Sequence, residues 1–371
     1  VNGNKKISQK DFLRMLTIDT SKELKIKLLN KQIQETYKSG YFEYINYDLI
    51  PIDHIYSDLI INVKEVNNKQ LKLGVIWDNH YKLIGKVKWD IFNKPLKRLR
   101  IQDELIFSGF KQNKFTLYYL ILDNNKIDIL PFIRKTNRIQ TLGIFNHNNN
   151  IIEYIKHDLN SISYGFTLSM MQYGSLSFET NDSDNKFNGI TNNIDFSKVA
   201  LDIDQLDDLL NPRNGYNIML NYKVSNGQTE DFDYLNIQTQ YFKTFYHNHT
   251  VRLFSLYKKA TENIPVDLLS TYGGYNWAVG YNEFTLSSYD LSLFGIEYQF
   301  HYKNSTTLTF IINHIEKNNT LTNTPTNYGF GIKVRSIVGP INFTWGRGYE
   351  DPFNKESKRT NIFYFNFGVE I

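Results

Sequence analysis

The C-terminal stretch Asn361-Ile-Phe-Tyr-Phe-Asn-Phe-Gly-Val-Glu-Ile371 decides the fold of this chain. Large apolar side chains occupy every second position, and polar or small side chains lie between them. The apolar set is Phe363, Phe365, Phe367, Val369 and Ile371. A period of two predicts a β-strand with one apolar and one polar face. At the edge of a soluble sheet such a strand would invite aggregation, whereas in a closed membrane barrel it pairs with the first strand and faces lipid.

The same alternation recurs through residues 68–371, and the faces opposite the apolar side chains are strongly polar. In one segment, Leu235 and Ile237 alternate with Asn236 and Gln238. Such polar side chains would be costly in the dry core of a β-sandwich, but they suit the water-filled lumen of a barrel. We therefore predict a mostly β chain that forms a 16-strand antiparallel transmembrane β-barrel over residues 68–371. A soluble β-sandwich is the alternative.

The strand pattern recurs in an even number of segments, as expected for bacterial barrels. The predicted strands are residues 69–79, 82–93, 97–109, 113–123, 126–146, 150–171, 174–181, 192–206, 215–226, 232–245, 249–260, 288–302, 306–317, 326–336, 339–349 and 361–371. Segments 126–146 and 150–171 are longer than one membrane crossing needs. We expect them to extend beyond the bilayer or to contain a bulge.

One connection has the composition of a compact turn. In Asn211-Pro-Arg-Asn-Gly215, Pro212 fixes φ and Gly215 allows a positive φ. We expect this turn on the periplasmic side of the barrel. The polar segments 180–192 and 351–360 predict longer loops outside the cell.

The composition restricts the classes of function. The 371 residues are 15% aromatic, include no cysteine and carry a formal net charge of +4. A charge this small and unclustered gives little support to nucleic-acid binding. No apolar run approaches the roughly 18 residues that a membrane helix requires. Since the sequence begins at Val1 without a Met or a signal peptide, we expect a mature form or a fragment of a longer protein.

Residues 1–67 predict a small α/β module instead of barrel strands. Ser8, three residues before Asp11, fits the start of a first helix. A second helix is indicated by one apolar stripe, formed by Ile26, Leu29, Ile33 and Tyr37. Gly40 would end this helix. Two strand-like segments follow at residues 41–49 and 59–66.

The segments Lys38-Ser-Gly-Tyr-Phe-Glu-Tyr-Ile45 and Leu59-Ile-Ile-Asn-Val-Lys-Glu-Val66 resemble the end of a polypeptide-transport-associated (POTRA) domain. This resemblance implies the order strand, helix, helix, strand, strand, in which residues 1–4 retain only the end of a clipped first strand. In that family the open edge of the sheet docks extended chains by strand addition. A plain spacer that holds another domain away from the membrane is the alternative.

The longest interruption of the strand pattern, residues 261–287, contains Leu269-Ser-Thr-Tyr-Gly-Gly-Tyr-Asn-Trp-Ala-Val-Gly-Tyr281. It resembles the inward-folded loop of outer-membrane assembly and two-partner-secretion barrels. That loop usually ends in Arg-Gly-Tyr or Arg-Gly-Phe, with the Arg packed inside the barrel, and Val279 occupies the Arg position here. The resemblance implies a lumen plug formed by Gly273, Gly274, Tyr275, Trp277, Val279, Gly280 and Tyr281. An ordinary glycine-rich surface loop is the alternative.

Two further stretches narrow the resemblance within the surface-antigen and outer-membrane assembly superfamily. Residues 201–216 combine an Asp-rich strand end with Pro-x-x-Gly-Tyr, as that superfamily does. Segments 152–156 and 173–178 resemble the barrel of the type Vd autotransporters. These are patatin-like phospholipases with a lipase passenger, one POTRA domain and a barrel in a single chain. The Asn- and Lys-rich composition is typical of an AT-rich genome and fits a fusobacterial member.

The sequence offers no catalytic residues and no metal or cofactor site. The Gly-x-Ser-x-Gly elbow of a patatin-like lipase does not occur in it. A Cys/His metal cluster and a phosphate-binding glycine loop do not occur either. His157 lies near Ser161, but this grouping is too common to indicate a site, and His301 is predicted to line the lumen. Any lipase activity would belong to an upstream passenger.

We expect an outer-membrane translocator or anchor whose POTRA domain lies in the periplasm. By resemblance, it helps to export a fused N-terminal patatin-like phospholipase or holds it at the surface. Expected partners are outer-membrane lipid, this passenger, periplasmic chaperones, the barrel-assembly machinery and a second copy in a homodimer. The alternatives are a secretion or assembly pore that acts on separate client proteins, and a diffusion porin.

Overall fold

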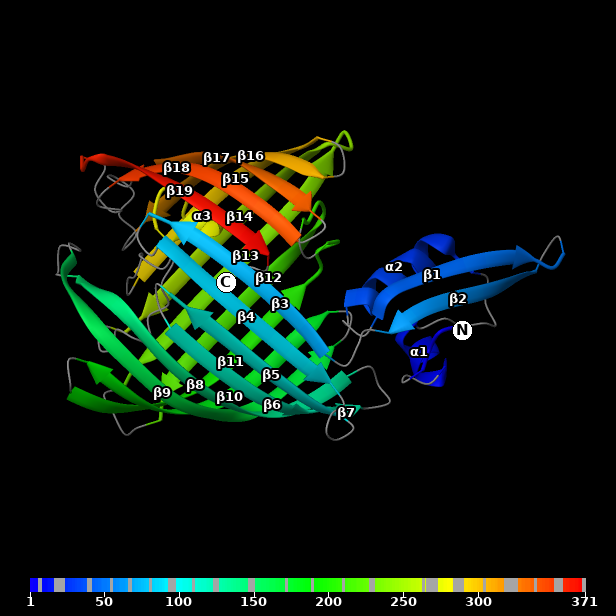
Figure 1. Cartoon of the computed structure of the whole chain (residues 1–371), viewed down its shortest axis with the longest axis horizontal. Coiled ribbons are helices and arrows are strands. Elements are labelled where there is room, and N and C mark those ends of the chain that lie inside the picture. The colour runs from blue at the N-terminus through cyan, green and yellow to red at the C-terminus, as the bar shows by residue number, and fades with distance from the viewer. Residues whose placement is uncertain are drawn as a thin grey trace.

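The computed structural model describes two parts, an N-terminal module and a closed barrel (Figure 1). The module lies beyond the end of the barrel at which the first barrel strand begins. The structure describes the chain except residues 6–8, 17–23, 39–41, 54–55, 66–68, 80–81, 93–97, 109–110, 123–126, 146–150, 171–172, 188–189, 209–210, 227–230, 262–263, 265–272, 283–289, 303–304, 317–325, 337–338, 350–355 and 369–371. No helix in this described part has both the length and the apolar character that a membrane crossing requires.

The N-terminal module has two helices and a hairpin with a core of their own. Its elements are α1 (Gln9–Leu16), α2 (Ile26–Lys38), β1 (Phe42–Pro51) and β2 (Ser57–Glu65). Phe12 and Leu16 of α1 are fully buried. The ring of Phe12 meets that of Phe42 edge to face, with 5.1 Å between centroids. This contact joins the first helix to the hairpin.

The chain start lies alongside the hairpin as a third extended segment. Asn2 forms a parallel bridge with Asn62 of β2. The Asn2 N–H donates to the Ile61 carbonyl oxygen at 2.8 Å, and the Val63 N–H donates to the Asn2 carbonyl oxygen at 2.9 Å. In consequence β2 lies between β1 and the first residues of the chain.

The stripe predicted for α2 is partly wrong. Leu29 is buried as expected, but Ile26 is 51% exposed because it is the first residue of the helix and lies outside its packed part. Ile33 packs against the core as predicted, and the buried face also includes Gln32 and Thr36. The Thr36 hydroxyl donates to the Gln32 carbonyl oxygen at 2.8 Å, which lets a polar side chain be buried there. The proposed helix-boundary residues at positions 8 and 40 lie outside the described residues.

The barrel is closed, and its neighbouring strands in the described residues pair antiparallel. Its strands are β3 (Lys69–Asp78), β4 (Lys82–Phe92), β5 (Leu99–Phe107), β6 (Lys111–Tyr119), β7 (Ile121–Leu122), β8 (Ile127–Phe145), β9 (Ile151–Met170), β10 (Gly174–Phe187), β11 (Ile190–Asp204), β12 (Gly215–Ser225), β13 (Asp233–Phe245), β14 (His249–Ala260), β15 (Asp290–Tyr302), β16 (Thr306–Glu316), β17 (Thr326–Ser336), β18 (Gly339–Tyr349) and β19 (Arg359–Gly368). Since β6 and β7 pair with successive parts of β8, they act as one interrupted strand. The predicted 16-strand closed barrel is therefore confirmed.

The loop predicted at residues 180–192 is wrong, because most of this segment is strand. β10 continues to Phe187, β11 begins at Ile190, and the two pair throughout. Asp182 and Asp184 are exposed on one face, whereas Asn181 on the other face is buried. With polar side chains on both faces, the apolar half of the strand pattern disappears, and composition alone suggests a loop.

The two long strands contain the bulge that is one of the two features expected of them. β8 has 19 residues and β9 has 20, and they pair along almost their whole length. Their register shifts between Ile144 and Phe145, near the end away from the N-terminal module. Lys135 and Asn137, on the way to that end, are exposed and polar. Ile139, two residues beyond Asn137, is again apolar and exposed, so the outer face of β8 is mixed in this part.

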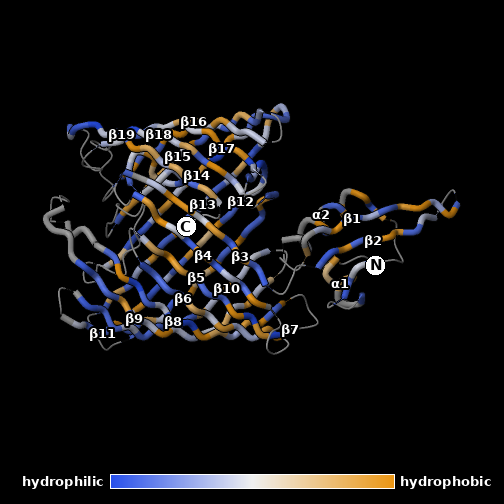
Figure 2. Tube along the Cα trace, in the orientation of Figure 1, coloured by the Kyte–Doolittle hydropathy of each residue, from blue (hydrophilic) through white to orange (hydrophobic). Residues whose placement is uncertain are grey.

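Apolar and polar residues alternate along the barrel strands (Figure 2). Many large apolar side chains of the wall are exposed on the outside, whereas many polar ones are buried on the inside. On β19, Phe363 is exposed, whereas Ile362, Tyr364 and Asn366 face inward and are buried. The barrel-closing residues Val369 and Ile371 lie outside the described residues. Large exposed apolar residues on other strands include Leu71, Leu73, Trp89, Phe107, Phe115, Ile133, Tyr164, Tyr216, Tyr241, Leu253, Phe294, Phe310, Phe330 and Phe343. This pattern fits a wall that faces lipid outside and water or polar protein groups inside.

Candidate functional site

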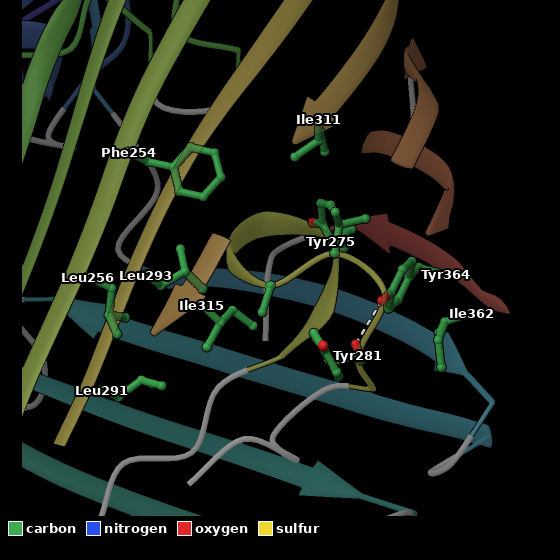
Figure 3. Close-up of a cluster of buried hydrophobic side chains, with 12 residues drawn as sticks. Phe254, Leu256, Tyr275, Tyr281, Leu291, Leu293, Ile311, Ile315, Ile362 and Tyr364 are labelled. Atoms are coloured by element: carbon green, nitrogen blue, oxygen red, sulfur yellow. Dashed lines mark hydrogen bonds between the residues drawn. The ribbon is translucent and has the colours of Figure 1, made fainter. Parts of the chain in front are cut away.

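A short helix folded inside the barrel forms the candidate site (Figure 3). This helix, α3 (Gly274–Trp277), belongs to the connection between β14 and β15, at the end of the barrel away from the N-terminal module. We call residues 273–282 the plug. The plug residues named from the sequence are buried except for Trp277, which is half-buried: Gly273, Gly274, Tyr275, Val279, Gly280 and Tyr281. Their side chains pack in one apolar cluster with inward residues of the wall, including Leu256, Leu293, Ile311 and Ile315.

The plug is hydrogen-bonded to β19, the last strand of the barrel. The hydroxyl of Tyr364 accepts a hydrogen bond from the Gly280 N–H at 2.8 Å and donates one to the Tyr281 carbonyl oxygen at 2.7 Å. The second of these is the dashed line in Figure 3. Two residues further along β19, the Asn366 amide donates to the Tyr275 hydroxyl at 2.7 Å. One strand thus contacts both the start and the end of the plug.

Polar side chains of β16 and β17 contact the plug from the other side. The Asn313 amide donates to the Trp277 carbonyl oxygen at 3.3 Å. The Tyr281 hydroxyl donates to Asn327 at 3.2 Å, and Asn327 in turn donates to Asn313 at 3.1 Å. These two buried inward asparagines therefore bind the plug through both its backbone and a side chain.

Val279 packs where the wall carries glycine. A β-carbon placed on Gly329 would lie 2.5 Å from Val279 Cγ2, and one on Gly346 would lie 2.7 Å from the same atom. At Gly348, a β-carbon would lie 2.4 Å from the Gly280 carbonyl oxygen. The missing side chains of β17 and β18 therefore form a notch that receives the tip of the plug. An arginine at position 279 would not fit this fully buried notch.

A buried ion cluster beside the plug lies on the wall strands. Glu297 is 1% exposed, and it accepts hydrogen bonds from Arg252 at 2.9 Å and Lys333 at 2.8 Å. The guanidinium carbon of Arg252 lies 4.4 Å from the ring centre of Phe254 and 5.6 Å from that of Trp277. The cation that contacts the plug is thus carried by β14, and a carboxylate of β15 balances its charge.

The inner wall formed by β3 to β6 is rich in lysine. In register across β3 to β6, Lys72 lies opposite Lys88, Lys88 opposite Glu104, and Glu104 opposite Lys114. Lys86 also approaches Glu104, at 3.4 Å. Asp90 and Glu179 also interact with this row, but the lysine and arginine side chains outnumber the carboxylates, which gives this side of the lumen a positive potential.

The seam between the last and the first strand of the barrel is short. β19 pairs with β3 over residues 365–368 and 74–77, four positions, whereas it pairs with β18 at nine. Beyond these four positions, the Asn79 side chain bridges the gap by accepting a hydrogen bond from the Phe363 N–H at 3.3 Å and donating one to the Asn361 carbonyl oxygen at 3.4 Å. In the described residues the seam thus has fewer backbone pairs than the other barrel interfaces, apart from the short β7 segment.

The turn proposed at residues 211–215 lies at the end of the barrel nearest the module. Gly215 has φ +112, and a β-carbon there would lie 2.1 Å from the Gln205 carbonyl oxygen. Pro212 precedes Arg213, whose N–H donates to Asp207 at 2.8 Å. The turn is therefore closed by an aspartate side chain and requires glycine at its last position.

Two histidines of the barrel strands are buried and hydrogen-bonded to neighbouring side chains. His301 is buried on the inner face and bonds to Thr250 at 2.8 Å and Thr307 at 3.0 Å. His157 is buried beside Asn185 at 2.9 Å. Within the described residues, no group of three or more His, Cys, Asp or Glu could hold a metal ion.

Sequence reasoning did not identify Tyr364, Arg252 or the wall glycines as plug contacts. Tyr364 and Asn366 were placed on the polar face of the last strand, but nothing local linked them to a loop more than eighty residues earlier. One usable signal was the Gly346-Arg-Gly348 pattern, which puts two glycines side by side on one face of a strand.

No protein-family model matches the sequence, and no curated protein matches it. Solved structures do match. BamA from Haemophilus ducreyi, solved without its POTRA domains 1–3, is similar over 99% of this chain and 83% of its own length, with TM-score 0.65 and 10% identity. CdiB from Acinetobacter baumannii is similar over 100% of this chain and 73% of its own length, with TM-score 0.60 and 14% identity. CdiB from Escherichia coli is similar over 96% and 73%, with TM-score 0.59 and 10% identity. At these identities the likeness shows a shared barrel fold.

Proposed function

We propose that this chain is an outer-membrane pore that moves polypeptide across the membrane or inserts it there. The single observation that carries the proposal is a closed barrel with an apolar outer wall whose lumen is occupied by a loop of the chain itself. A loop folded against one side of the lumen narrows the path for free diffusion, so a porin is disfavoured. A plug and a short seam suit a pore that opens only when a polypeptide substrate binds to it.

We further propose that residues 1–67 form a POTRA domain in the periplasm. The parallel bridge at Asn2 supports the implied order strand, helix, helix, strand, strand, because it puts the chain start beside β2. The similarity to BamA covers 99% of this chain, so it includes the N-terminal module. The open edge of β1 would then receive extended chain by strand addition.

Two kinds of cargo fit this proposal. A fused patatin-like phospholipase upstream of Val1 is the cargo that the sequence resemblance implies, whereas the fold likeness to CdiB and BamA supports separate client proteins equally well. Outer-membrane lipid, chaperones, the barrel-assembly machinery and a homodimer partner remain proposed partners. Catalysis is not proposed for this chain.

The test begins with refolding in detergent micelles followed by gel electrophoresis with and without boiling. A folded barrel should migrate faster unboiled, and the protein should leave solution when detergent is removed. If the protein stays soluble without detergent and shows no mobility shift, the proposal of a membrane barrel is contradicted.

Cargo is then tested in cells by fusing a reporter domain upstream of Val1 and by co-expressing the same reporter separately. Protease sensitivity at the cell surface that requires fusion would support the autotransporter form. Sensitivity of the separate reporter would support a client pore. If neither reporter reaches the surface while the barrel is folded, export by this chain is contradicted.

A further inference from the structure

We propose that the lumen binds acidic segments of its polypeptide substrate through a half-ring of basic side chains on the inner wall. The inference rests on the proposed function, because it names the kind of chain that the pore accepts. The members of this basic half-ring are Lys72, Lys86, Lys88, Lys114, Arg134 and Lys198. They are carried by strands between β3 and β11, which occupy one half of the closed barrel.

On β3 to β6, four lysines surround one glutamate. Lys88 lies opposite both Lys72 and Glu104 in register, and it interacts electrostatically with both. The ammonium nitrogen of Lys86 lies 3.4 Å from a carboxylate oxygen of Glu104. Lys114 lies opposite the same glutamate on the next strand. The basic side chains here are close enough to act on one shared ligand.

The network continues across β8 to β11 around a second glutamate. The guanidinium of Arg134 donates to Glu179 at 2.9 Å, and the ammonium nitrogen of Lys198 lies 3.6 Å from the other carboxylate oxygen. Lys114 interacts electrostatically with all three of these residues. It therefore joins the two parts of the half-ring into one charged surface.

The other inward carboxylates of these strands do not remove the excess of positive charge. Asp90 also interacts with the half-ring, but it accepts two hydrogen bonds from Arg100, at 3.0 and 2.6 Å. Asp202 and Asp204 lie at the end of β11 nearest the N-terminal module, and Asp128 lies at the corresponding end of β8. Within the network itself, including Asp90 and Arg100, seven basic side chains interact with three carboxylates.

The chemistry and extent of the half-ring favour an extended acidic chain over a small anion. Its resident partners are carboxylates, so the basic groups already accept the ligand chemistry of Asp and Glu. Neighbouring strands lie about 4.8 Å apart, so the half-ring follows roughly 30 Å of curved wall, more than a small anion can contact. Rings of basic side chains select anions in the same way in other pores. The described hydrogen bonds of the plug to the wall come from β16, β17, β18 and β19, outside this half.

The first experiment measures peptide binding to the full chain refolded in uncharged detergent micelles. The probe is a dye-labelled peptide of about fifteen residues with glutamate at every third position, long enough to span the half-ring. In the reference peptide, glutamine replaces each glutamate. We expect at least about tenfold tighter binding of the acidic peptide by fluorescence anisotropy, and weaker binding at about 1 M salt than at 0.1 M, because salt screens the charges. Equal binding of the two peptides would overturn the inference.

Paired substitutions locate the binding. Lys88→Gln with Lys114→Gln should weaken binding of the acidic peptide about tenfold. The matched control is Lys135→Gln with Lys156→Gln, which removes the same charge from exposed lysines on the outer face of β8 and β9 and should leave the affinity unchanged. An equal loss in both proteins would contradict a luminal site.

Folding of each variant is checked by its unboiled gel mobility. If the luminal variant does not fold, carbodiimide cross-linking of the acidic peptide to the unsubstituted protein replaces it. Peptide adducts on Lys88 or Lys114 would support the inference, and adducts confined to other lysines would overturn it.

A final pair of tests separates the ligand class from the function. Tighter binding of a thymidine oligonucleotide than of an acidic peptide of equal charge would overturn the assignment to polypeptide. In cells, the reporter fused upstream of Val1 receives either the acidic segment or its glutamine counterpart as a linker. Better export with the acidic linker is expected. Equal export of both contradicts the inference while the proposed function stands, whereas export of neither contradicts the proposed function itself.

Discussion

Replacing Gly346 with alanine tests the contact between the plug and the barrel wall. The backbone at this residue does not have a positive φ, so alanine is permitted by the local conformation. A β-carbon at Gly346 would lie 2.6 Å from the Gly280 nitrogen, 2.7 Å from Val279 Cγ2 and 3.2 Å from the Gly280 Cα. These three nearest atoms all belong to the plug. The added methyl group would therefore clash with the plug.

The size of the effect follows from these distances. Carbon atoms attract best at about 3.5–4.0 Å, so the plug must retreat by roughly 1 Å to remove the overlap. That retreat lengthens the 2.8 Å bond between the Gly280 nitrogen and the Tyr364 hydroxyl. Overpacking of this kind costs about 1–3 kcal/mol. We expect it to raise the released fraction of the plug by about 5- to 150-fold.

The assay uses a thiol placed in the plug. Because the chain has no cysteine, Asn276→Cys in α3 gives a unique site for a water-soluble maleimide. Labelling should be slow with Gly346 and at least about fivefold faster with alanine there. Gly85→Ala is the matched control, because the three atoms nearest to its β-carbon all belong to the ring of Phe107, which is exposed on the outer wall. Unchanged labelling in a folded Gly346→Ala barrel would refute the reasoning that the plug is seated in this notch.

Three further predictions concern the wall and a turn. Glu297→Gln leaves Arg252 and Lys333 without a counter-charge, which should cost about 3–5 kcal/mol of folding stability. We therefore expect the gel mobility shift to disappear at a lower temperature. An unchanged temperature would contradict a stabilising role of Glu297. With plug release, the lysine row predicts anion preference in a salt gradient across a planar bilayer, and Lys72→Glu with Lys88→Glu should move the reversal potential toward cations. The same potential in both proteins would show that these lysines do not line the conducting path. Gly215→Ala forces a side chain at φ +112 and should destabilise the turn by more than about 1 kcal/mol, reducing the fraction that refolds to the fast-migrating form; equal refolding would contradict the need for glycine.

The sequence by itself determined the strands of the barrel and the face that each side chain occupies. Alternation with period two is a local property of extended backbone, so Phe363 and its neighbours on β19 could be assigned without knowing any partner. It failed at residues 180–192, where polar side chains on both faces of β10 removed the apolar half of the signal. The Gly-rich loop at residues 273–281 also stood out locally, as a break in the strand pattern.

Only the tertiary structure decided how the plug is held and which strands close the barrel. The contacts of Tyr364 with Gly280 and Tyr281 join residues 84 and 83 positions apart, and closure of β19 on β3 joins the two ends of the barrel sequence. No local period encodes such meetings, because they depend on strand tilt, closure and the space that wall glycines leave. The same separation explains why a valine can replace an expected arginine at position 279, since its fit depends on Gly329 and Gly346 across the lumen.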